Sequence, residues 1–164
     1  FLLQVKDLTT GALLPDAIEL MIQHELGEHR AAGLLGDDWE RMLESIDDAR
    51  TELQLRSVRD LLADCLVTLP WLLDSGRPLL AQLWWLSFEG LRRVLAPEMT
   101  PALQALLAGE ASALRALARS GEQHWRDCGI ELLQAWHRGG PDAVASHASR
   151  LFAPTGSTAS RRRA

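Results

Sequence analysis

The segment from His24 to His29, HELGEH, is the part of this sequence closest to a metal-binding motif. In the zinc-protease motif HExxH the histidines stand at positions i and i+4, about 40° apart on a helix, so both can bind one metal ion. Here the two histidines stand at i and i+5, about 140° apart, and Glu28 takes the place of the second ligand. We therefore expect no zinc site in this segment and interpret it as a solvated polar face of a helix.

No other familiar catalytic motif is present in the sequence. It has no GxGxxG or GxxxxGK phosphate loop and no GxSxG nucleophile elbow. An enzyme would have to gather polar groups from separate segments, and the candidates are Asp64, Thr68, His124, Arg92 and Arg93. We predict no enzyme, no catalytic residues and no cofactor. The alternative of a small all-α enzyme that uses Asp64 and His124 stays open.

The elements that must position these residues are helices. Apolar residues recur at helical spacing from Pro15 onward, and no strand pattern follows residue 7. The sequence thus predicts an all-α fold, an antiparallel bundle of about six to seven helices after a short N-terminal β or linker remnant. The segment Pro78–Ala96 is apolar almost all round, which predicts one central helix that is buried on most sides.

Prolines and glycines indicate where these helices bend or end. Pro70 lies within an apolar run and predicts a kink. A long helix is expected over Glu110–Arg138, because the sequence Gly-Gly-Pro follows it directly. Gly121 and Gly129 lie inside this helix, where glycine is unfavourable, so each marks a bend or a site of close packing.

Charge and composition restrict the possible partners. The net charge is −5, and the three arginines near the C-terminus contribute +3, so the rest of the chain carries −8. An acidic body does not favour a broad face for DNA phosphates. There is no run of eighteen apolar residues and no signal-peptide pattern, so we expect no membrane span and a cytoplasmic location. Cys65 and Cys128 lack CxxC spacing and are expected to be buried free thiols.

The stretch from Asp64 to Pro78, DCLVTLPWLLDSGRP, carries the clearest likeness to a known family. An Asp on a helix is followed by a turn that contains Gly76 and Pro78, and a second apolar helix starts directly afterwards. This layout resembles the helix–turn–helix junction in the effector-binding FCD domain of bacterial GntR-type transcription regulators. A further likeness is the stretch LLAGEASALRALARSGEQHW, in which a Gly-Glu pair precedes an Ala/Leu-rich helix.

The resemblance also implies where a ligand would bind. Many members of that family hold a divalent metal with one Asp and three His; here Thr68 and Gly121 replace two of the His, so we predict no bound metal. The resemblance then implies a small effector, acyl or otherwise apolar, between the segment Pro78–Ala96 and the long helix, where Gly121 would leave room for it. The residues implied as ligand-binding are Asp64, Thr68, Trp84, Trp85, Arg92, Gly121 and His124.

On this resemblance, residues 13–153 form the ligand-binding and dimerisation domain of a transcription regulator. Residues 1–12 would be a linker or the end of a missing N-terminal winged-helix domain, and residues 154–164 a disordered tail. The expected partners are a small-molecule effector and a second copy of the chain, in a homodimer formed by helices of this domain. DNA would be contacted only through a domain absent from this chain. A helical-bundle interaction module without a ligand is the alternative.

Overall fold

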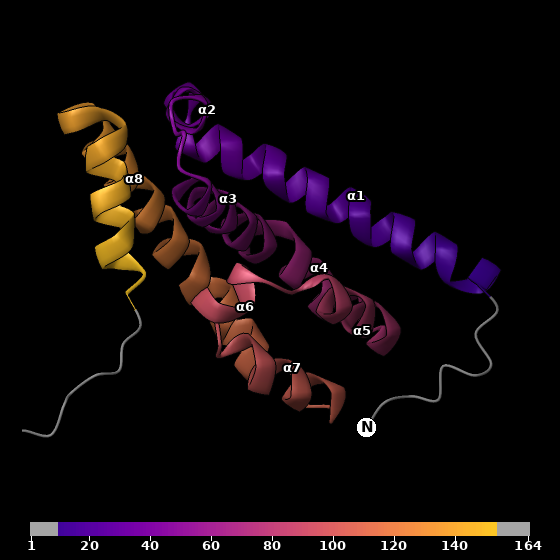
Figure 1. Cartoon of the computed structure of the whole chain (residues 1–164). Helices are drawn as coiled ribbons and strands as arrows, with labels where there is room; N and C mark the ends of the chain where they lie inside the picture. Colours follow the sequence, from indigo (N-terminus) through magenta and orange to yellow (C-terminus); the bar gives the residue numbers. More distant parts are fainter. Residues whose placement is uncertain (1–9, 154–164) are drawn as a thin grey trace, which may run out of the picture.

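The computed structural model describes residues 10–153, with side chains from Leu14 onward (Figure 1). The described part of the chain is helical, which confirms the predicted all-α bundle. The helices are α1 (Thr10–Leu35), α2 (Asp37–Glu44), α3 (Ala49–Ala63), the π-helical segment η2 (Asp64–Thr68), α4 (Leu69–Ser75), α5 (Pro78–Ser87), α6 (Leu91–Leu95), α7 (Met99–Leu107) and α8 (Ser112–Leu151).

The predicted strand or linker in residues 1–9 and the predicted tail in residues 154–164 lie outside the described residues. Helix α1 already begins at Thr10, before the predicted start of the helical domain at residue 13. Within the described range, no helix is both long enough and apolar enough to cross a membrane.

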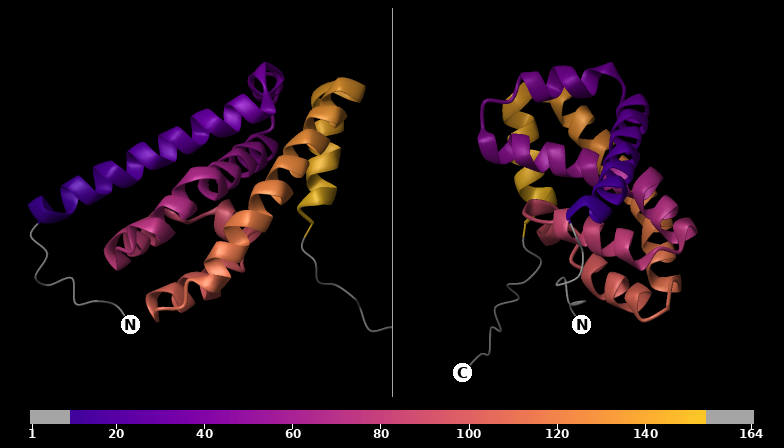
Figure 2. Two further views of the ribbon diagram at one scale, coloured as in Figure 1. Left: turned by 180° about the vertical axis from the view of Figure 1, so that it is seen from behind. Right: turned by 90° about the vertical axis from the view of Figure 1, so that its right-hand side faces the viewer.

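The helices form three layers, seen most clearly from behind (Figure 2). Helix α1 runs along one side of the rod formed by α3, η2 and α4, in the opposite direction to it. The chain reverses at Gly76, and α5 runs back so that Trp84 reaches Asp64. The first part of α8 crosses the other side of this rod and packs against α3, η2 and α4, while α7 covers its start. The segment η2 therefore lies in the middle layer, between α1 and α8.

Local signals explain how the middle layer begins and where it changes pitch. Asp48 caps α3 by accepting a 2.8 Å hydrogen bond from the backbone N–H of Thr51. The expected irregularity near Pro70 lies just before it, as the wide π turn η2, and the rod continues into α4. Proline has no N–H and its ring crowds the carbonyl four residues back, which favours a wider turn at this point.

The prediction of one central helix over Pro78–Ala96 is wrong, because the segment forms two helices. Helix α5 ends at Ser87, and Gly90 turns the chain at φ 62°, a conformation that favours glycine. The side chains of Arg92 and Arg93 then donate to the carbonyl oxygens of Ser87 and Phe88. These bonds satisfy acceptors that the end of α5 leaves open, so the break is stabilised by its own sequence.

Close packing at glycines brings the layers together. A Cβ atom added at Gly121 in α8 would lie 2.6 Å from Sγ of Cys65, and one added at Gly129 would lie 2.5 Å from Cδ2 of Leu35. Both glycines thus mark close packing, which is one of the two expected outcomes. The predicted end of the long helix is also confirmed, because Gly139 and Gly140 leave helical geometry and the chain turns back.

Helix α1 is divided into two different faces. Its inner face, towards α3 and η2, carries the buried residues Leu20, Gly27, Ala31 and Leu35. A Cβ atom at Gly27 would stand 2.6 Å from the carbonyl oxygen of Ala63, so the two backbones approach each other closely here. The other side, which we call the outward face of α1, is defined by five exposed apolar residues: Leu14, Ile18, Met21, Ile22 and Leu26.

Candidate functional site

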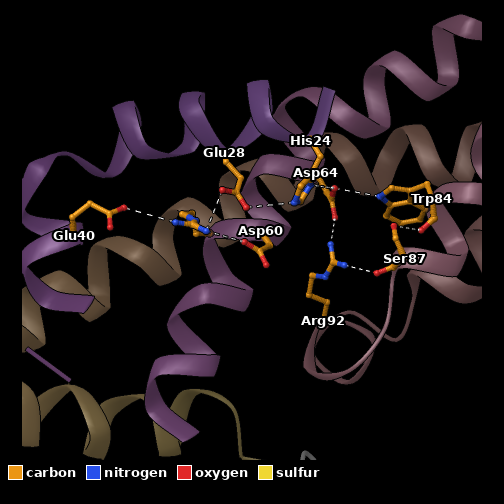
Figure 3. A network of polar contacts seen from close by, with 9 residues as sticks. His24, Glu28, Glu40, Asp60, Asp64, Trp84, Ser87 and Arg92 are labelled. Atoms are coloured by element: carbon orange, nitrogen blue, oxygen red, sulfur yellow. Dashed lines mark hydrogen bonds and ion pairs between the residues drawn. The ribbon is translucent and has the colours of Figure 1, made fainter. Parts of the chain in front are cut away.

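The carboxylate of Asp64 is fully buried at the first position of η2 and is surrounded by donors from three other segments (Figure 3). Its Oδ1 accepts a 3.2 Å hydrogen bond from Nε1 of Trp84 and lies 3.5 Å from Nδ1 of His24. Its Oδ2 lies 3.3 Å from Nη1 of Arg92, and Nη2 of the same guanidinium donates to the carbonyl oxygen of Ser87. We call these four side chains, Asp64, His24, Trp84 and Arg92, the Asp64 cluster.

His24 connects the Asp64 cluster to a second group of charges. Its Nε2 lies 3.4 Å from Glu28 on the same helix, and Glu28 in turn lies 3.2 Å from Arg59 of α3. Arg59 also pairs with Glu40 at 3.8 Å and with Asp60 at 3.5 Å. The result is a chain of charges that ties α1 and α2 to α3, and α1 to η2, α5 and α6 (Figure 3).

Two pKa shifts follow from this packing. The hydrogen bond to Asp64 raises the pKa of His24, with the charges of Glu28 and Asp60 acting in the same direction and burial opposing them. Burial raises the pKa of Asp60, while the neighbouring Arg59 opposes that shift. A protonated His24 between two carboxylates is the arrangement that the charges favour.

The residues predicted as ligand-binding fall into separate places. Asp64, Trp84 and Arg92 meet in the Asp64 cluster, and Thr68 is buried one turn further on, where its hydroxyl has no hydrogen-bond partner in the described part of the chain. Trp85 is half-buried, with the guanidinium of Arg93 4.3 Å from the centre of its ring.

Gly121 and His124 line a different feature, an open groove of about 330 Å³ between α7 and α8. The other residues that line it are Glu98, Met99, Leu117, Ser120 and Trp125. The groove thus lies on the α7 side of the long helix and includes no residue of the segment Pro78–Ser87. The room expected beside Gly121 on the other side is filled by Cys65.

The two cysteines are buried and free, as predicted. Burial raises the pKa of the Cys65 thiol far above its usual value and that of the Cys128 thiol to about 11. His124 lies 3.8 Å from Sγ of Cys128, yet a thiol with such a pKa remains protonated and is a poor nucleophile. Asp64 and His124, the pair named for a possible enzyme, belong to different sites.

Comparison with known protein families identifies the family of this chain. Residues 8–154 match the model of a family described as "Family of unknown function (DUF6866) C-terminal domain". The chain belongs to this family. No curated protein and no solved structure matches the sequence.

Within this DUF6866 C-terminal domain, the Asp64 cluster acts as a structural tie. Both carboxylate oxygens of Asp64 are engaged by protein donors, and Trp84 and Arg92 come from segments 20 and 28 residues away in sequence. Removing one partner of a buried ion pair typically costs about 3–5 kcal/mol, because the other charge stays buried without compensation. Among residues 10–153, no group of three or more His, Cys, Asp and Glu side chains is arranged to hold a metal ion.

Sequence reasoning missed His24 and Glu28, which had been interpreted as part of a solvated polar face. That interpretation is wrong for these two residues, because both contact the charge chain on the inner side of α1. The sequence contained a signal for this position. His24 and Glu28 stand four residues apart, and their spacing places them on the same helix face as the small and apolar residues Leu20, Gly27 and Ala31. The neighbouring Glu25 and His29 are exposed, as expected for a polar face.

We predict that the contact of His24 with Asp64 stabilises the fold less as the pH rises. A histidine with a raised pKa in the folded state stabilises the fold below its unfolded pKa of about 6.5, and this contribution is lost as the pH rises through the folded value. The free energy of unfolding, measured with urea, should therefore fall above about pH 6.5, and His24→Gln should lack this part of the fall. His29→Gln, on the exposed side of the same helix, should retain it. An identical pH dependence in wild type and His24→Gln would contradict the role of His24.

Proposed function

We propose that this domain is a helical interaction module that docks onto another protein surface through the outward face of α1. One observation carries the proposal: Leu14, Ile18, Met21, Ile22 and Leu26 lie on this face and are each 44–60% exposed. The five side chains expose on the order of 500 Å² of apolar surface, as much as the largest patch on a typical monomer, and such patches often mark interaction sites.

A rotation of α1 about its own axis cannot bury the outward face. The opposite side of the helix is held by the close backbone contact at Gly27 and by the pairing of His24 with Asp64. Turning Ile18 or Ile22 inward would remove both contacts and would expose Leu20. The apolar residues on the outside are therefore a fixed feature of the fold.

Other exposed large apolar residues in the described part of the chain do not gather in this way. They are Leu34, at the far end of α1, and Leu53, Leu86, Val94, Leu107 and Ile130, each of these five on a different helix. Single exposed apolar residues are normal on protein surfaces and need no explanation. Only α1 presents several of them along four consecutive turns.

Met21 allows a direct test of this proposal, because methionine is readily oxidised when it is exposed. In hydroxyl-radical footprinting of the full-length protein, we expect Met21 to be protected at working concentration, although it is 60% exposed in the isolated chain. Met42 and Met99 are buried and supply the protected reference. Oxidation of Met21 at the rate of a free methionine under all conditions would refute the docking function.

A second candidate function is supported by the groove between α7 and α8. It contains Gly121 and His124, two of the residues implied by the resemblance to GntR-type regulators, and it combines apolar walls with the polar residues Glu98 and Ser120. Its volume of about 330 Å³ falls at the lower end of the range for small-molecule sites. In this proposal the domain senses a small apolar or acyl effector, dimerises, and acts in the cytoplasm on DNA through another domain.

A thermal-shift screen tests the effector proposal. A ligand at 100 times its dissociation constant stabilises a fold by about 2.7 kcal/mol, which raises the melting temperature by several degrees. We expect an acyl-CoA, a fatty acid or a small carboxylate to do so in wild type and not in Ser120→Trp, which would fill the groove. Ser149→Trp, at an exposed serine elsewhere on α8, is the control. The proposal fails if no compound shifts wild type or if both variants respond equally.

A further inference from the structure

We infer that the outward face of α1 binds the same face of a second copy of this chain, with the two helices antiparallel. The inference rests on the proposed docking function and names its partner. It places the contact between subunits on α1 and not on the strongly apolar segment Pro78–Ala96. Most of the bulk of that segment is used inside the bundle, since Leu80, Trp84 and Phe88 are buried.

The spacing of residues on α1 makes its outward face self-complementary. If two antiparallel copies cross on the outward side of α1 at the height of residue 20, Ile18 of one copy lies against Ile22 of the other, and Leu14 lies against Leu26. A two-fold axis repeats each of these contacts, as in most homodimers. Met21 lies beside the centre of the crossing, where its flexible side chain fills the space between the isoleucines.

The charges on this side of α1 favour the antiparallel arrangement. Towards its C-terminal end the exposed side carries Glu25, His29 and Arg30, whereas its N-terminal half carries Leu14, Ala17 and Ile18. A parallel pair would set Glu25 against Glu25 and Arg30 against Arg30, and like charges directly opposite are unfavourable. An antiparallel pair places these charges at the two edges of the contact, where they remain in water.

The area of the outward face matches what a dimer needs. Two copies that each cover on the order of 500 Å² of apolar surface bury about 1,000 Å², the lower bound for a specific interface. The apolar centre with a charged rim is also the usual composition of such an interface. The structure thus provides a contact of modest size, and we expect a dimer that forms at micromolar concentration.

Light scattering after size-exclusion chromatography tests the identity of the partner. Wild type at micromolar concentration should have the mass of two chains, and Ile22→Glu should have the mass of one, with its dimer weakened at least about 30-fold, as for a central interface residue. Because Ile22 is 52% exposed, Ile22→Glu should melt cooperatively. Ile130→Glu replaces an isoleucine on α8 that is 40% exposed, and it should remain a dimer.

Cysteine pairing tests the orientation. Leu14→Cys and Leu26→Cys should form a mixed disulfide rapidly when the two variants are combined, because the antiparallel contact brings these positions together. In a parallel pair each variant would instead cross-link to itself, since the two positions are about 18 Å apart along the helix. The native cysteines are buried and do not compete. Faster self-linking of Leu14→Cys than mixed linking would overturn the antiparallel geometry.

The molecular mass from light scattering and the oxidation of Met21 together show whether this inference or the docking function fails. A doubled mass in wild type, lost in Ile22→Glu, with Met21 protected, supports both. The mass of one chain with Met21 protected means that another part of the full-length chain covers α1, so the second copy is excluded while docking onto a surface within the full-length protein stands. A single mass with Met21 oxidised freely overturns both. A doubled mass that Ile22→Glu leaves unchanged also overturns the inference, because the dimer then uses another face.

Discussion

At Gly27 the backbone of α1 lies so close to α3 that an added Cβ atom would stand 2.6 Å from the carbonyl oxygen of Ala63. Only glycine permits this approach without displacing one of the helices. It sets the distance between the first two layers, and at that distance His24, one turn earlier, reaches the buried carboxylate of Asp64 at 3.5 Å. Asp64 in turn holds Trp84 of α5 and Arg92 of α6, so the contact at one glycine orders the polar interior of the bundle.

The same constraint determines what is left for function. Because the inner side of α1 is held by backbone contact and by charge, its apolar outward face is not buried by any other described part of the chain. The buried charges are paired with one another, and in the described residues the thiols are protonated and no metal cluster is arranged. The polar contacts around Asp64 thus hold the helices together, and the proposed docking relies on the apolar outward face of α1.

Much of this fold was predictable, because it depends on signals within short stretches of sequence. The cap at Asp48, the turn at Gly76 before Pro78 and the break at Gly139 and Gly140 all depend on the local preferences of these residues. The predictions that proved wrong depend on contacts between residues that are far apart in the sequence. An apolar pattern cannot reveal that Arg92 and Arg93 stabilise a break in the segment Pro78–Ala96. Nor can it reveal that Cys65, 56 residues earlier, fills the space beside Gly121, or that His24 faces Asp64.

The central claim, that α1 is fixed by its backbone contact with α3, is tested most directly by two alanine substitutions in the same helix. Gly27→Ala should lower the free energy of unfolding by about 1–3 kcal/mol, because its Cβ atom collides with the backbone of α3. Gly33→Ala meets nothing within 4 Å and should raise that free energy by about 0.4–1 kcal/mol, the normal effect of removing a helical glycine. Both can be measured by urea denaturation. If Gly27→Ala stabilises the protein as Gly33→Ala does, α1 is not held against α3 in this way, and the outward face loses its fixed position.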